Sequence, residues 1–139
     1  MNGLVVDASV GLKWYLDEPQ AAMARRLLRD EDHLSVPHLF FTEIGAVLGK
    51  RYRRREISAQ VVVATLEAVE EVPIEVWPDR DLLWDALAIA LRCGCSVYDG
   101  LYLALADRID GRVVTADRRL VNAAAGTGWA ARLLSLDEL

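Results

Sequence analysis

Short apolar runs alternate with helical segments along the whole of this 139-residue chain. Brief runs rich in apolar and β-branched residues predict strands over 3–6, 33–36, 74–77, 112–115 and 132–134. Between them, apolar residues recur at helical spacing and predict helices over 9–16, 20–29, 39–53, 58–69, 81–91, 97–108 and 117–124. Because such alternation produces parallel sheets covered by helices, the sequence predicts an α/β fold, a three-layer α/β/α sandwich with a central parallel sheet.

One domain is expected to span residues 1–139, since this length supports one substantial core and no repeat or linker interrupts it. Charged residues break every apolar run before it reaches membrane-spanning length, and the N-terminus lacks the features of a secretory signal. Cys93 and Cys95 lie closer together than zinc-ligand pairs usually do, which favours two reduced thiols. A cytoplasmic protein that binds no membrane is therefore expected.

Two aspartates directly follow predicted strands. Asp7 comes after Leu4–Val6, and Asp117 comes two residues after the run Val113–Thr115. In open α/β sheets, ligands bind outside the carboxyl ends of the strands, so these two acids are expected to meet in space. Helix capping is an equally good interpretation of either aspartate taken alone.

Glu43 falls on the same helical face as Phe40, Ile44 and Val47. A carboxylate on an apolar face costs several kcal/mol unless it finds a cation or hydrogen-bond donors. Glu43 is therefore a candidate functional residue, and the alternative is a buried salt bridge to one of the arginines.

Asp99 stands at the start of the helix predicted over 97–108, whose central residues 101–106 are apolar on every side. Its spacing from Ser96 fits a capping box, which would explain Asp99 without any function. Asp99 becomes a functional candidate because three other acids are expected at the same place.

Four converging carboxylates repel one another, so without a cation some of them would hold protons. Oxygen ligands without histidine or thiolate suit Mg²⁺ or Mn²⁺ better than Zn²⁺. Such a metal site carries out phosphoryl chemistry. Ser9 and Thr115 lie two residues from Asp7 and Asp117, where their hydroxyls are expected either to support the site or to satisfy local backbone groups.

The acidic positions and their neighbours resemble the PIN domain family, and more narrowly the VapC toxins of bacterial and archaeal toxin–antitoxin pairs. The resemblance covers essentially the whole chain. It rests on four motifs in order: Val5-Val6-Asp7-Ala8-Ser9, Glu43-Ile44, Tyr98-Asp99-Gly100 with the apolar residues up to Ala106, and Val114-Thr115-Ala116-Asp117-Arg118-Arg119-Leu120.

This resemblance implies an α/β/α sandwich and an endoribonuclease that depends on Mg²⁺ or Mn²⁺. It also implies a homodimer and a cognate antitoxin protein whose C-terminal segment wraps the toxin and blocks the site. The acidic quartet of the family matches Asp7, Glu43, Asp99 and Asp117 here, while Ser9 and Thr115 match frequent polar neighbours. Ala116 stands where many relatives have Asn, a departure that leaves the metal ligands intact.

The net charge of −5 argues against binding nucleic acid, but the positive charges are unevenly distributed. Residues 50–55 include five basic side chains, and Arg118 and Arg119 directly follow Asp117. A basic rim beside a metal site can hold an RNA backbone despite a negative net charge. Arg118, Arg119 and Arg51 are thus the candidate substrate-binding residues, although a solvated helix end explains the 50–55 run equally well.

The hypothesis is hydrolysis of an RNA phosphodiester by a metal-activated water, with Asp7, Asp99 and Asp117 as metal ligands. Glu43 binds a second metal or orients the water. An aspartate-nucleophile phosphatase of the haloacid dehalogenase type needs a second acid two residues after the first, and Ser9 stands there. A response-regulator receiver needs an acid pair after the first strand, where only Asp7 occurs. The remaining alternative is a non-catalytic PIN-like module that binds RNA or protein.

Overall fold

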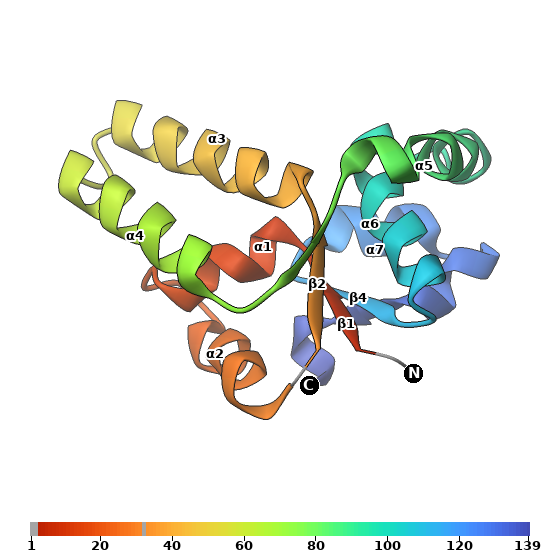
Figure 1. The fold of residues 1–139 in the computed structure, drawn as a ribbon, viewed down its shortest axis with the longest axis horizontal. Helices are drawn as coiled ribbons and strands as arrows, with labels where there is room; N and C mark the ends of the chain where they lie inside the picture. Colours follow the sequence, from red (N-terminus) through yellow and green to blue (C-terminus); the bar gives the residue numbers. More distant parts are fainter. Residues whose placement is uncertain (1–2, 32) are drawn as a thin grey trace.

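A five-stranded parallel sheet forms the centre of the molecule, with the strand order β3-β2-β1-β4-β5. The computed structural model describes residues 3–31 and 33–139. The sheet is seen nearly edge-on in Figure 1, with helices on both sides, which confirms the predicted fold class. The strands lie within one residue of their predicted ends: β1 (Leu4–Val6), β2 (Leu34–Pro37), β3 (Glu75–Trp77), β4 (Arg112–Thr115) and β5 (Leu133–Ser135).

Helical segments connect successive strands, as a parallel sheet requires. The segment predicted as one helix over 9–16 divides into a short α-helix and a 3₁₀ turn, and another 3₁₀ segment precedes β5. The helices are α1 (Ala8–Gly11), η1 (Leu12–Trp14), α2 (Ala21–Asp30), α3 (Leu39–Arg53), α4 (Ala59–Glu71), α5 (Asp79–Cys93), α6 (Val97–Arg108), α7 (Arg118–Ala124), η2 (Gly128–Arg132) and η3 (Leu136–Glu138).

The strands carry apolar side chains on both faces, and each face has its own core. Leu4 and Val6 pack with residues from α1 to α4, whereas Val5 between them packs with α5 and α6. This division follows from the two-residue period of a strand. Figure 1 shows the same division, with α1 to α4 on one side of the sheet and α5 with α6 on the other.

Helix α6 is buried from Asp99 to Ala106, in agreement with its apolar sequence. Its close approach to α5 depends on Gly100, because a Cβ there would lie 2.3 Å from the carbonyl oxygen of Ala86. Within residues 3–31 and 33–139, no single helix is long and apolar enough to cross a membrane. Among the described residues, α5 and α6 taken together meet that length and composition, as a pair bent by 114°.

Candidate active site

The pairing of β1 with β4 brings Asp7 next to Thr115. Val6 is the partner of Val114 in this pairing, so the next residue on each strand lies at the same edge of the sheet. The Thr115 hydroxyl donates to Oδ2 of Asp7 over 2.8 Å, and the Ser9 hydroxyl donates to the same oxygen over 2.7 Å. The Asp7 carboxylate is thus buried and held by two hydroxyls. We call Asp7, Ser9 and Thr115 the Asp7 corner.

Burial is the largest influence on the pKa of Asp7 and raises it, because burial disfavours the charged form. The hydrogen bonds from Ser9 and Thr115 favour the carboxylate and oppose this rise, whereas the negative charges of Asp117 and Asp99 add to it. Because the pKa of Asp7 is raised, the two hydrogen bonds do not fully compensate its charged form for burial and for the neighbouring negative charges. A nearby cation would stabilise the charged carboxylate.

Asp117 caps α7, and helix capping was the alternative to a functional role that its place in the sequence predicted. Its Oδ1 accepts a hydrogen bond from the backbone N–H of Arg119 over 2.9 Å. Its own backbone N–H donates to the Thr115 hydroxyl over 3.0 Å, so Thr115 contacts both aspartates. The second oxygen, Oδ2, lies 3.1 Å from Nη2 of Arg119. Capping therefore uses only one carboxylate oxygen, Oδ1.

Asp99 lies in the first turn of α6, and its backbone N–H donates to the Ser96 hydroxyl over 3.1 Å. This cap uses the backbone of Asp99 and leaves its carboxylate available. That carboxylate accepts two hydrogen bonds from Arg119, of 3.0 and 3.3 Å. The side chain of Arg119 is 62% exposed, so a solvated cation joins Asp99 to Asp117. We call these three residues the arginine corner.

Glu43 reaches the site from α3 and is half-buried. The Tyr102 hydroxyl on α6 donates to its Oε1 over 2.7 Å, where the sequence had suggested a buried arginine as the alternative to a functional role. Burial is the largest cause of the raised pKa of Glu43; the hydrogen bond from Tyr102 opposes the rise, and the charges of the three aspartates add to it. The four predicted acids therefore influence one another at one edge of the sheet.

Tyr102 is a site residue that the sequence reasoning missed. It lies in the buried, apolar part of α6, where the sequence pattern predicts a core residue. The signal was present, because a buried tyrosine hydroxyl needs a hydrogen-bond partner. Which partner it would find depends on how α3 and α6 face each other.

A hollow of about 350 Å³ opens beside the acids, and we call it the carboxylate pocket. Arg51, one of the predicted substrate-binding residues, lies in its wall and is ion-paired with Glu18. Lys13 and Glu18 also line it, and neither was predicted from the sequence. The full lining is Asp7, Ala8, Ser9, Leu12, Lys13, Glu18, Glu43, Val47, Arg51, Ala116 and Asp117.

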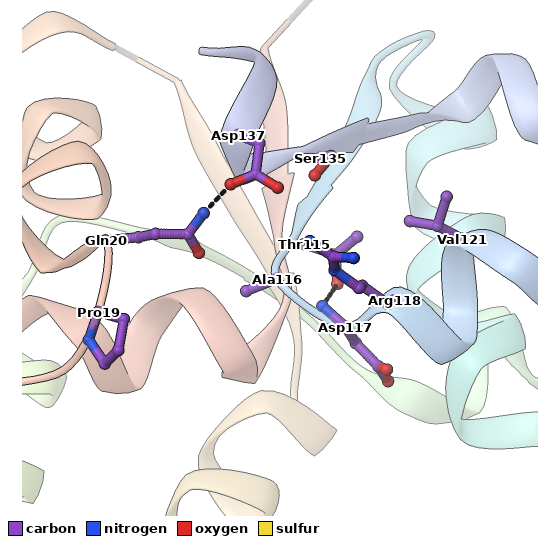
Figure 2. Close-up of a pocket in the computed structure, with 9 residues that line it drawn as sticks. All are labelled: Pro19, Gln20, Thr115, Ala116, Asp117, Arg118, Val121, Ser135 and Asp137. Atoms are coloured by element: carbon purple, nitrogen blue, oxygen red, sulfur yellow. Dashed lines mark hydrogen bonds between the residues drawn. The ribbon is translucent and has the colours of Figure 1, made fainter.

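A second hollow, of about 310 Å³, lies on the other side of Ala116 and Asp117 (Figure 2). Gln20 and Asp137 are hydrogen-bonded to each other at one side of it, and the carboxylate of Asp117 points away from them. Arg118, another predicted substrate-binding residue, contributes to this lining. Ala116 and Asp117 line both hollows.

The chemistry of these donors fits a divalent cation bound through oxygen. Carboxylates and hydroxyls are the ligands that Mg²⁺ and Mn²⁺ prefer. Burial is the main cause of the raised pKa values of Asp7 and Glu43, and the negative charges of the neighbouring acids add to it. As they stand, no three His, Cys, Asp or Glu side chains in the described residues converge closely enough to hold a metal. Asp99 and Asp117 point to the guanidinium of Arg119 instead.

Comparison with known proteins places this arrangement in a family. The PIN domain family matches residues 4–126. Ribonuclease VapC3 of Pyrobaculum aerophilum is 34% identical over 119 residues, which are 84% of this chain and 91% of that protein. Ribonuclease VapC1 of Mycobacterium tuberculosis is 31% identical over 88% of this chain and 92% of its own.

A solved structure supports the fold independently. The crystal structure of Mycobacterium tuberculosis VapC20, described as a sarcin–ricin loop cleaving toxin, superimposes with a TM-score of 0.68 over 89% of this chain and 95% of its own. Its sequence identity is 18%, so this likeness concerns the fold alone. The family match, together with relatives above 30% identity over most of their length, shows that this chain belongs to the PIN domain family and to its VapC ribonucleases.

Proposed function

We propose that this protein is a metal-dependent endoribonuclease, the VapC-type toxin of a toxin–antitoxin pair, that hydrolyses RNA phosphodiesters. The observation that carries the proposal is the meeting of Asp7, Glu43, Asp99 and Asp117 at one edge of the sheet, beside a pocket of about 350 Å³. Burial and the charges of the neighbouring acids raise the pKa values of Asp7 and Glu43, and carboxylates with raised pKa values beside a pocket are typical of functional sites.

Mg²⁺ or Mn²⁺ would be held by Asp7, Asp99 and Asp117, and Glu43 would bind a second ion or orient the attacking water. When bound, the metal polarises the phosphate and supplies a hydroxide-like water at neutral pH. Ser9 and Thr115 fix the direction of the Asp7 carboxylate through their hydroxyls. Tyr102 does the same for Glu43.

The proposed substrate is an RNA chain whose backbone lies across the positive side chains around the pocket. Arg51 lines the carboxylate pocket, Arg118 lines the hollow beyond Asp117, and Arg119 lies between Asp99 and Asp117. Arginine pairs well with phosphate because its guanidinium offers parallel donors. These cations surround the acids on several sides, which suits a polyanion larger than a single phosphate.

The test is cleavage of total cellular RNA by purified protein in Mg²⁺ or Mn²⁺, compared with EDTA and with Asp7→Asn. Discrete fragments that require metal and disappear in the variant are expected. Asp85→Asn, an exposed acid on α5 away from the pocket, is the matched control and should cleave normally. If folded protein free of partners cleaves none of this RNA, a non-catalytic binding module becomes the better description.

An antitoxin protein is the proposed regulator, and the cytoplasm, where RNA is available, is the proposed location. Cys93 and Cys95 are both free thiols, which accords with a reducing compartment. An antitoxin that covers the carboxylate pocket should abolish cleavage at an equimolar ratio. A complex that retains full cleavage would contradict this mode of inhibition.

A homodimer formed through α5 completes the proposal. This helix exposes Leu83, Trp84, Leu87 and Leu91, with 84% of Trp84 and 79% of Leu91 accessible. Exposed apolar side chains on one helix indicate a protein interface. Sedimentation should show a dimer that Trp84→Glu dissociates. Val63→Glu on α4, also at an exposed apolar position, should leave the dimer unchanged.

A further inference from the structure

Three charged side chains form one wall of the carboxylate pocket. The carboxylate of Glu18 lies between two cations: Oε1 accepts from Nζ of Lys13 over 3.3 Å, and Oε2 is ion-paired with Arg51. Lys13 comes from η1, Glu18 from the segment before α2, and Arg51 from the last turn of α3. We call these three residues the cation wall.

The cation wall is unusually buried for charged groups. The side chains of Lys13 and Glu18 are only 12% and 14% exposed, and that of Arg51 is 29% exposed. Burying charges costs several kcal/mol even when they are paired, and apolar side chains could join these segments equally well. Two cations on one anion also leave one positive charge in excess. Both features are better explained by a ligand than by stability.

The lining of the same pocket also includes three acids, Asp7, Glu43 and Asp117. Within the described part of the chain, neither Lys13 nor Arg51 is ion-paired with any of these acids. Both instead pair with Glu18. Glu18 thereby keeps the two cations from pairing with these acids and neutralising them. The pocket lining thus keeps both cations and acids available to a ligand.

A phosphodiester bound at a metal site fits a pocket lined by both acids and cations. Its metal side would face the acids, while its other oxygens would meet the ammonium and the guanidinium. Lys13 has three N–H donors and Arg51 has five, so donors remain on both after each has bound Glu18. We propose that Lys13 and Arg51 bind a phosphate of the RNA backbone and that Glu18 is a positioning residue that holds them. This inference rests on the proposed function.

Binding of RNA without cleavage tests the inference separately from that function. A fluorescently labelled 20-nucleotide RNA of random sequence is titrated with the protein in EDTA over a range of salt concentrations. Lys13→Met and Arg51→Met should each weaken binding several-fold and reduce the slope of log K against log salt by roughly 0.7, the value for one phosphate contact on a single strand. Arg26→Met, which removes an exposed α2 arginine paired only with Asp30, should change neither quantity.

Glu18→Gln tests the positioning role, since it removes one charge and little volume. Freed from Glu18, the two cations are expected to move toward Asp7 and Glu43 and to compete with metal. Calorimetry should therefore show Mn²⁺ binding weakened several-fold, and RNA binding in EDTA should weaken as well, because the two cations no longer lie where they bind the phosphate. Unchanged Mn²⁺ affinity would overturn the role given to Glu18.

Thermal unfolding separates a ligand site from a structural brace. If Lys13→Met and Arg51→Met lower the melting temperature but leave RNA affinity and its salt slope unchanged, the inference is overturned, whether or not the wild-type protein cleaves RNA. If both variants lose RNA affinity as expected but the wild type never cleaves, the cation wall stands and the nuclease proposal fails.

Discussion

The two corners of the candidate active site hold their aspartates in opposite ways. At the Asp7 corner, the carboxylate is buried and both of its hydrogen-bond donors are neutral hydroxyls on neighbouring backbone. At the arginine corner, Asp99 and Asp117 share one guanidinium that is 62% exposed. Packing fixes the first corner, whereas a long and solvated side chain, free to rotate, determines the second.

This difference indicates how the site changes when it binds a ligand. The Asp7 corner is preorganised, because the register of β1 and β4 sets its geometry and no movement is needed. At the arginine corner, the pair between Arg119 and Asp117 lies near solvent, and exposed ion pairs are typically worth no more than about 1 kcal/mol. Metal or RNA phosphate can therefore displace Arg119 from its acids at little cost.

Removing the charge of one acid from each corner should give the largest contrast. Asp7→Asn should lower the cleavage rate by roughly 10³-fold or more, because it removes a buried metal ligand that no neighbour can replace. Asp117→Asn should lower it about tenfold to a hundredfold, because its half-exposed site has water as a substitute. Rates over a range of Mn²⁺ concentrations, with circular dichroism as the folding control, measure both. Equal losses would remove the distinction between the corners.

The second contrast concerns the residues that support the acids. Thr115→Val keeps the shape of the side chain but removes the hydroxyl that contacts both Asp7 and the backbone of Asp117. Supporting hydrogen bonds around metal ligands are typically worth roughly 10- to 100-fold in activity or metal affinity, and we expect a loss in this range. Thr115→Ser keeps the hydroxyl and should restore most of the activity. A valine variant with normal Mn²⁺ affinity would mean that the Asp7 corner is held by packing alone.

How far the sequence predicted these corners depends on the kind of contact. Asp7 and Asp117 could be placed together because they follow buried strands, and parallel strands end at one edge of the sheet. The fold class followed from the same alternation of strands and helices. Glu43 was marked by its position on an apolar helical face, although its donor proved to be Tyr102.

The sequence pattern did not predict the other side-chain contacts of the site. Glu18 lies in a segment without periodicity, between Asp17 and Pro19, so nothing indicated that it would join Lys13 to Arg51. The bridge made by Arg119 depends on the rotamers of a long exposed side chain, which spacing does not determine. Sequence patterns predict which segments form helices and strands. These contacts depend instead on the directions of side chains that come from three or more elements.

The arginine corner should respond weakly, and in the opposite direction, when its cation is removed. Arg119→Gln frees Asp99 and Asp117 from a competing positive charge, so Mn²⁺ should bind more tightly by less than about fivefold, the limit set by an exposed ion pair. Calorimetry measures this directly. Arg118→Gln is the matched control, since Arg118 lines the hollow shown in Figure 2 and should leave Mn²⁺ affinity unchanged. Weaker Mn²⁺ binding in Arg119→Gln would mean that Arg119 positions Asp99 and Asp117 for the metal and does not compete with it.

The smallest effect concerns stability without metal and follows from the raised pKa of Asp7. Burial lifts that pKa in the folded protein above its ordinary value of 3.8. Between 3.8 and the raised value, the folded state binds more protons than the unfolded state. The free energy of unfolding therefore falls as pH rises through this window, and at neutral pH the ionised Asp7 destabilises the fold.

Asp7→Asn removes this penalty while keeping an oxygen that Ser9 and Thr115 can donate to. In EDTA at pH 7.5 the variant should be more stable than the wild type by about 1 kcal/mol, as is common when a strained site is neutralised. The advantage should shrink as pH falls through the window and Asp7 takes up its proton. Asp117→Asn should show no such gain, because Asp117 is more exposed and its carboxylate caps α7. Urea unfolding at several pH values measures both variants. A wild type that is more stable than Asp7→Asn at pH 7.5 without metal would mean that the two hydrogen bonds outweigh the cost of burial. The ionised Asp7 would then not destabilise the metal-free protein.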